Sequence, residues 1–178
     1  NAALTMKNPS LIEFHSDSFK VLVKDLLAIS PNEGCALLVG DKKERAEKTS
    51  GSILRIHFVW PCCNIWSDSN PYFRDLSLTC VKDLNKQASK ENRFFIDPRE
   101  QIHAQRWARE RNWKVLGSAH SHPLGSARPS KIDIEMHSSE ELMIIMNKDS
   151  DIRVWWVSNN QKNSPQELDY IISSRPVQ

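Results

Sequence analysis

The sequence has few cysteines and no cysteine framework. Its 178 residues include four cysteines, and none of them forms a Cys-x-x-Cys pair. Cys62 and Cys63 are adjacent, a spacing at which a disulfide is strained, so we expect reduced thiols in a cytoplasmic protein. A zinc site made of cysteines alone is disfavoured as well, because the ligand spacing of such sites is missing.

Long apolar runs and a large net charge are also absent. The longest apolar runs, such as 142–146, are far too short to span a bilayer, and the polar N-terminus has no secretory pattern. The net charge is +2, from 24 basic and 22 acidic residues. This balance gives no general electrostatic reason for binding nucleic acid or an anionic membrane, so we expect neither as a partner.

What is present is typical of one globular domain that mixes helices and strands. Apolar residues at helical spacing predict a helix at about 17–29, and Asp97-Pro98 predicts the start of another that runs to about 111. We expect further helices at 75–90 and 130–136, and a polar loop over 41–52. Short apolar or alternating runs predict strands at 35–39, 53–60, 93–96, 114–122, 142–146, 153–157 and 168–172. The expected class is α/β or α+β.

The segment 115–133 carries a pattern of metal ligands. His120 and His122 lie two residues apart on a predicted strand, so their side chains point to the same face. Asp133 follows eleven residues later, beyond a loop long enough to fold back. Two imidazoles and one carboxylate form the three-ligand set of a catalytic zinc site, which leaves a position for a water whose pKa zinc lowers to about 7. For a chain of this length and composition, the probability that this pattern arises by chance is on the order of 10⁻³.

A purely structural interpretation of these residues stays open. Ser130 and Asp133 also suit a helix cap and an acidic first turn, and a single histidine is more often structural or solvated than a ligand. His137 lies one helical turn after Asp133, which makes it a candidate neighbour of the ligands. We expect His57 and His103 to be structural and solvated, respectively.

The motif resembles that of the JAMM (MPN+) metalloproteases. The match consists of His120-Ser121-His122-Pro123, seven intervening residues, then Ser130 and Asp133. The upstream glutamate of that family corresponds to Glu33, in a Pro-Asn-Glu segment that enters a strand. The segments 95–98 and 128–130 also look like those of the small, stand-alone bacterial members. The resemblance covers about residues 12–158.

This resemblance implies a fold and a reaction. The fold would be the JAMM/MPN, cytidine-deaminase-like fold, a central, mostly antiparallel curved sheet flanked by helices. His120, His122 and Asp133 would bind Zn²⁺, Glu33 would be the general base and then the general acid, and Ser130 would donate a hydrogen bond to the oxyanion. The enzyme would be a zinc metallopeptidase that hydrolyses the amide or isopeptide bond after the C-terminal Gly-Gly tail of a ubiquitin-like or sulfur-carrier protein.

Two departures from the family pattern bear on its boundaries and substrate. Cys35-Ala36 stands where family members often have Cys-Gly, and the segment 68–91 is longer than in the smallest bacterial members. Because alanine is small, we expect little effect of Ala36 on the site. We expect an N-terminal extension over residues 1–10 and a single domain over 11–178, with the segment at about 68–91 as an insertion near the substrate groove.

Other functions stay open. A non-catalytic MPN-type binding or scaffold module would lack the metal ligands that this chain retains. A RadC-like protein shares the His-Pro and Pro-Ser pattern, but it usually has Asn where this chain has Ser121, and a DNA-binding part upstream. A cytidine deaminase is disfavoured because the Pro-Cys-x-x-Cys ligands are missing. The sequence predicts neither the carrier protein, nor the leaving group, nor the oligomeric state.

Overall fold

The computed structural model describes residues 8–45, 51–67, 69, 88–136, 140–158 and 164–174. Strands and helices are interspersed along the chain, which confirms the expected mixed class of α/β or α+β. In chain order they are β1 (Pro9–His15), α1 (Ser16–Ala28), β2 (Cys35–Glu44), β3 (Ser52–Cys62), α3 (Pro98–Arg109), β4 (Lys114–His122), α4 (Lys131–Met136), β5 (Glu141–Asn147), β6 (Ile152–Val157) and β7 (Gln166–Ser173).

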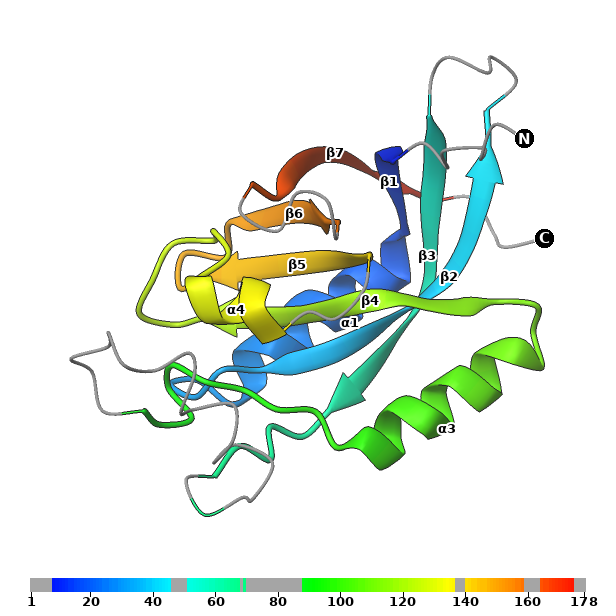
Figure 1. Ribbon diagram of the computed structural model, residues 1–178. Helices are drawn as coiled ribbons and strands as arrows, with labels where there is room; N and C mark the ends of the chain where they lie inside the picture. The colour runs from blue at the N-terminus through cyan, green and yellow to red at the C-terminus, as the bar shows by residue number, and fades with distance from the viewer. Residues whose placement is uncertain are drawn as a thin grey trace, which may run out of the picture.

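The strands form one strongly curved sheet. Its order is β1-β3-β2-β4-β5-β6-β7, and it closes on itself where β7 pairs with β1. The pairs β1–β3, β1–β7 and β4–β5 are parallel, and the other four pairs are antiparallel. This is the mostly antiparallel curved sheet that the family resemblance implied, and Figure 1 shows helices on both of its sides.

Helix α1 packs against one face of the sheet. Its buried residues Leu22 and Leu26 pack with the inward side chains of the strands, such as Leu38 of β2 and Ile144 of β5, in the main hydrophobic core. Both faces of β2 and β5 are covered by other parts of the chain, so successive side chains are buried in each strand. This explains why both strands read as continuous apolar runs in the sequence.

Helix α3 packs on the opposite face of the sheet. Cys35 and Leu37 of β2 point away from α1 and meet Ala104 of α3 and Ile96 in a second, smaller cluster. The side chain of Asp97 accepts a hydrogen bond from the Arg99 amide at 2.8 Å and Pro98 stands at the first helical position, as the sequence predicted. Strand β2 is therefore buried between α1 and α3.

One predicted strand is wrong, and one strand was not predicted. Residues 93–96 are irregular, because their polar backbone groups bond to loop residues instead of a neighbouring strand: Asn64 Nδ2 donates to Arg93 O at 2.9 Å, and Ile65 N donates to Phe95 O at 3.0 Å. Strand β1 received no prediction, and it starts at Pro9, within the segment expected to be an extension. The helix predicted at 75–90 lies mostly outside the described residues.

The predicted loop at 41–52 is also too long. Strand β2 continues to Glu44 and β3 begins at Ser52, so the two form an extended hairpin with polar side chains. Arg55 donates two hydrogen bonds to the Asp41 carboxylate, each at 2.6 Å, and His57 Nε2 lies 3.1 Å from the same group. These contacts hold the pKa of Asp41 below its usual value despite partial burial, which acts in the opposite direction. In this hairpin the strands are joined by cross-strand ion pairs instead of apolar side chains, so hydrophobic periodicity did not predict their full length.

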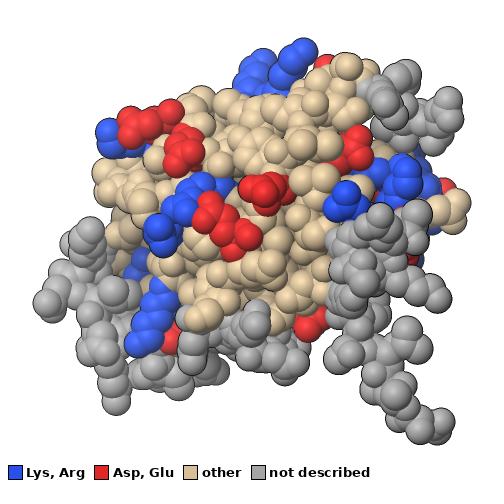
Figure 2. Space-filling model, turned by 90° about the horizontal axis from the view of Figure 1, so that it is seen from above, with Lys and Arg blue, Asp and Glu red and all other residues tan. Residues whose placement is uncertain are grey.

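The outer surface carries mixed charge. On the face in Figure 2, basic and acidic side chains are interspersed instead of gathering into one basic patch. Within the described ranges, no helix is both long enough and apolar enough to cross a membrane.

Close contact between β4 and β5 depends on Gly117. A Cβ atom at this position would lie 1.8 Å from the carbonyl oxygen of Leu142, inside the strand pairing. We predict that Gly117→Ala lowers the free energy of unfolding by about 2–3 kcal/mol, since the backbone must shift to make room. Urea denaturation of the two proteins measures this difference.

Gly125→Ala is the matched control, because its Cβ would find its nearest neighbour at 3.7 Å, an ordinary contact. If Gly117→Ala unfolded at the wild-type urea concentration, the close contact of β4 and β5 would be refuted.

Candidate metal centre

Strand β4 places two imidazoles on one face of the sheet. The side chain of Ala119 points into the core beneath α1. Because side chains alternate along a strand, His120 and His122 both point to the other face. The His120 side chain is fully buried, and that of His122 is 11% exposed. The alternation predicted from the sequence is therefore present, and the open side of the site lies at His122.

Helix α4 brings a carboxylate to the same place. Asp133 is the third residue of the helix and is 8% exposed. Ser130, just before the helix, donates its backbone N–H to Asp133 Oδ2 at 2.6 Å, and its hydroxyl oxygen accepts from the Asp133 amide at 3.2 Å. This reciprocal cap fixes the start of the helix and aims the carboxylate at β4.

Three potential ligand atoms converge. His120 Nε2 lies 2.9 Å from His122 Nε2 and 3.4 Å from Asp133 Oδ1, and His122 Nε2 lies 3.3 Å from Asp133 Oδ2. One ligand atom from each of the three residues lies within 4.8 Å of the others. A tetrahedral ion with ligand bonds of about 2.0–2.1 Å separates its donors by about 3.3–3.4 Å. The two separations that involve Asp133 match this spacing and the imidazole pair lies closer, so the group fits one metal ion and leaves one tetrahedral position for a non-protein ligand.

Neighbouring groups orient the two imidazoles. His122 Nδ1 lies 2.8 Å from the carbonyl oxygen of Ser126, an arrangement that directs Nε2 toward Asp133. The loop that contains Ser126 is anchored by Trp155, whose Nε1 donates to Ala127 O at 3.0 Å. The ring of Phe94 stacks on His120 with centroids 4.4 Å apart. The candidate ligands are thus held from several sides.

Glu33 lies beside this group because of the strand register. Cys35 of β2 is paired with His120 of β4, and Ser121 continues the pairing by donating its backbone N–H to Gly34 O at 3.0 Å and accepting from Gly34 N through Oγ at 2.8 Å. In an antiparallel pair the next residues in each direction are Glu33 and His122. The sequence separates them by 89 positions, and the register brings them together.

The pKa values of Glu33, Asp133 and His122 reflect both burial and the charges of neighbouring groups. Burial raises the pKa of Glu33 to about 8; the negative charge of Asp133 adds to this, whereas His122 and Arg93 oppose it. Burial would also raise the pKa of Asp133, but the two imidazoles outweigh it and hold the pKa well below its usual value. Burial lowers the pKa of His122, and the contacts with Asp133 reverse this to a net increase.

The comparison with protein families agrees with this geometry. The model that describes prokaryotic homologs of the JAB domain, Prok-JAB, matches residues 15–158. The chain belongs to this family. The Prok-JAB match spans β2 to β6, and therefore contains the His120, His122 and Asp133 group together with Glu33.

Solved structures show the same fold at low sequence identity. A protein of Desulfitobacterium hafniense is 20% identical, with a TM-score of 0.66 over 92% of this chain and 94% of that one. A protein of Salinibacter ruber is 16% identical, with a TM-score of 0.56 over 90% of this chain and 91% of that one. No curated protein is significantly similar to the chain.

Sequence reasoning identified the converging residues but not those that support them. His57 stacks on Trp113 and lies beside Asp41, away from the group, and His103 is exposed on α3; His137 lies outside the described residues. The supporting residues Ser121 and Phe94 received no role. For Ser121 a signal existed, because a residue between two ligands on a strand must point into the core, where a hydroxyl needs a partner.

We predict that the protein binds one divalent metal ion per chain and that His122→Ala weakens binding by more than about 100-fold, since even the outer partners of metal ligands are worth about 10–100-fold. Competition with a chromophoric chelator measures the affinity, and circular dichroism checks the fold.

His103→Ala is the matched control, because it removes an exposed imidazole of α3 that is not part of the group. Equal affinity of His122→Ala and the wild-type protein would exclude His122 as a ligand.

Proposed function

We propose that the protein is a zinc-dependent peptidase of the JAMM type, which hydrolyses the amide or isopeptide bond after the C-terminal Gly-Gly tail of a ubiquitin-like or sulfur-carrier protein. The observation that carries this proposal is the convergence of His120, His122 and Asp133 beside the buried Glu33. Two nitrogen donors and one carboxylate, with a position left open, are typical of a catalytic zinc site.

The three ligands would hold the ion between β4 and α4. When bound there, zinc supplies two effects, a lower pKa of about 7 for a water molecule and polarisation of the substrate carbonyl. His120 is fully buried and His122 retains 11% exposure, so water and substrate approach from the His122 side.

Glu33 would move the proton. Its carboxyl group lies next to His122 in the strand register, within the field of both His122 and Asp133. It takes a proton from the attacking water and delivers it to the leaving nitrogen. Burial favours the protonated form of this carboxyl group, which suits the second half of this task, and the positive charge of a bound ion favours the ionised form that begins it.

Ser130 would stabilise the charge that develops on the substrate oxygen. Its hydroxyl oxygen accepts from the Asp133 amide, so the hydroxyl hydrogen stays available for donation. Ser130 is exposed, whereas Asp133 is buried, so the serine is the member of the pair that a substrate can reach. One donor of this kind typically contributes about 2.7–4 kcal/mol to catalysis.

The substrate class rests on the family resemblance and on the chemistry of the site. An extended C-terminal tail with glycines at its end can reach a metal ion that is recessed between a strand and a helix, because glycine has no side chain to obstruct it. A cytoplasmic location is part of the proposal, since Cys35, Cys62 and Cys63 are free thiols in the described part of the chain.

We predict that Glu33→Gln abolishes hydrolysis of a ubiquitin-like protein carrying a C-terminal extension, with a fall in kcat of at least about 100-fold, because a glutamine cannot exchange the proton. The zinc affinity should stay at the wild-type value, since Glu33 is not a ligand. Product masses measured on carrier proteins of the same organism check the cleavage.

Glu91→Gln serves as the control, because the same chemical change falls on an exposed residue. Retained turnover in Glu33→Gln would remove Glu33 from the mechanism, and an inactive wild-type protein on every carrier would refute the proposed substrate class.

A further inference from the structure

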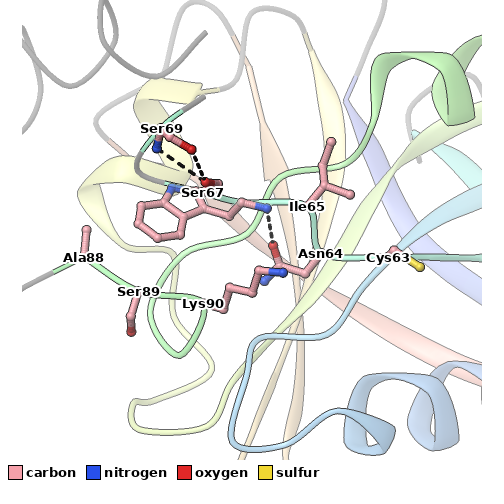
Figure 3. A pocket seen from close by; sticks show the side chains of 9 residues that line it. Cys63, Asn64, Ile65, Ser67, Ser69, Ala88, Ser89 and Lys90 are labelled. Carbon is pink, nitrogen blue, oxygen red and sulfur yellow. Dashed lines mark hydrogen bonds between the residues drawn. The ribbon is translucent and has the colours of Figure 1, made fainter. Parts of the chain in front are cut away.

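Asn64 is a buried polar residue that the mechanism above does not use. It follows β3, is 6% exposed, and lies between Cys63 and Ile65 in the wall of a pocket of about 990 Å³. Figure 3 shows Asn64 among the residues that line this pocket, between Cys63 and Ile65 along the chain. A buried amide needs partners for every polar atom, so its contacts indicate what it does.

The Asn64 side chain uses its whole hydrogen-bonding capacity on the backbone. Nδ2 donates to Glu33 O at 3.0 Å and to Arg93 O at 2.9 Å. Oδ1 accepts from Trp66 N at 3.0 Å and from Phe95 N at 3.2 Å. An asparagine amide has two donor hydrogens and two acceptor lone pairs, and all four have partners here.

These four bonds join segments that no strand pairing joins. Residues 63–67 and 93–97 are irregular, and the turn that ends at Gly34 precedes β2. Asn64 holds the carbonyl side of Glu33, and Lys90 O accepts from the Glu33 amide at 2.7 Å, so the backbone of Glu33 is held on both sides. The position of Glu33 therefore depends on the loops around Asn64 as well as on β4.

The same bonds fix the ring that covers His120. Phe94 lies between Arg93 and Phe95, the two residues of its segment that bond to Asn64, and its ring stacks on His120 at 4.4 Å with 22° between the planes. A displacement of Asn64 would therefore move both Glu33, the proposed general base, and the ring that stacks on His120, a proposed metal ligand.

We propose that Asn64 is a positioning residue that sets the placement of Glu33 and of the Phe94 ring relative to His120. This inference rests on the proposed function for its catalytic consequence. A misplacement of about 1 Å in a catalytic group can lower the rate by about 10²-fold. Because the Asn64 side chain bonds to three backbone segments, it prevents displacements of this size.

Asn64→Asp is the sharpest test because the shape is kept. The acceptor oxygen for Trp66 and Phe95 remains, but the donor becomes a second oxygen that faces the carbonyls of Glu33 and Arg93. With zinc loaded, we expect kcat to fall roughly 10–100-fold, with KM within about twofold of wild type. In hydrogen-exchange experiments the Glu33 amide should exchange faster in the variant.

Two controls separate positioning from general effects. Asn112→Asp makes the same change at an exposed residue and should leave kcat and exchange unaltered. Leu168→Ala removes a buried side chain of β7, and should lower Tm while kcat and the exchange of the Glu33 amide keep their wild-type values.

A wild-type measurement covers the case in which Asn64→Asp does not fold. Both Nδ2 hydrogens of Asn64 should show slow exchange in nuclear magnetic resonance spectra, and rapid exchange would overturn the proposal. Unchanged kcat and unchanged exchange of the Glu33 amide in Asn64→Asp would also overturn it. An inactive wild-type protein would instead refute the proposed function, while the exchange data would still decide whether Asn64 places Glu33.

Discussion

The antiparallel register of β2 against β4 is the constraint on which the rest of the site depends. It pairs Cys35 with His120, and Ser121 extends the pairing to Gly34 through two hydrogen bonds. Because side chains alternate along a strand, this register puts Glu33 and both imidazoles on the face away from α1. A shift by one residue would turn the histidines into the core beneath α1 and separate them from α4.

Several groups of the site have a structural and a chemical role at once. Ser130 caps α4 through the same bonds that aim the Asp133 carboxylate at the imidazoles. The interpretation of these residues as a helix cap is therefore correct, and it is compatible with metal binding. Burial raises the pKa of the Glu33 side chain, and Asn64 holds the backbone carbonyl of the same residue. Burying the ionisable side chains of His120, His122 and Asp133 together costs free energy unless a compensating charge is present. A bound cation would supply that charge.

The sequence predicted the convergence of His120, His122 and Asp133 better than the scaffold around them. Strand β4 was predicted with its observed bounds, and on a strand the spacing of His120 and His122 requires a common face. The extension of β2 to Glu44 was missed, since its pattern is one of cross-strand ion pairs. The role of Asn64 could not be predicted, because its four partners belong to segments that only the fold brings together.

The central claim is that a zinc ion binds to two imidazoles and one carboxylate at the junction of β4 and α4. X-ray absorption spectroscopy of the zinc-loaded protein tests it most directly, because nitrogen and oxygen ligands at about 2.0–2.1 Å are distinguished from thiolate sulfur at about 2.3 Å. The account predicts scattering from two imidazole rings and no sulfur in the first shell. A sulfur contribution from Cys62 or Cys63, or a spectrum without imidazole scattering, would contradict it.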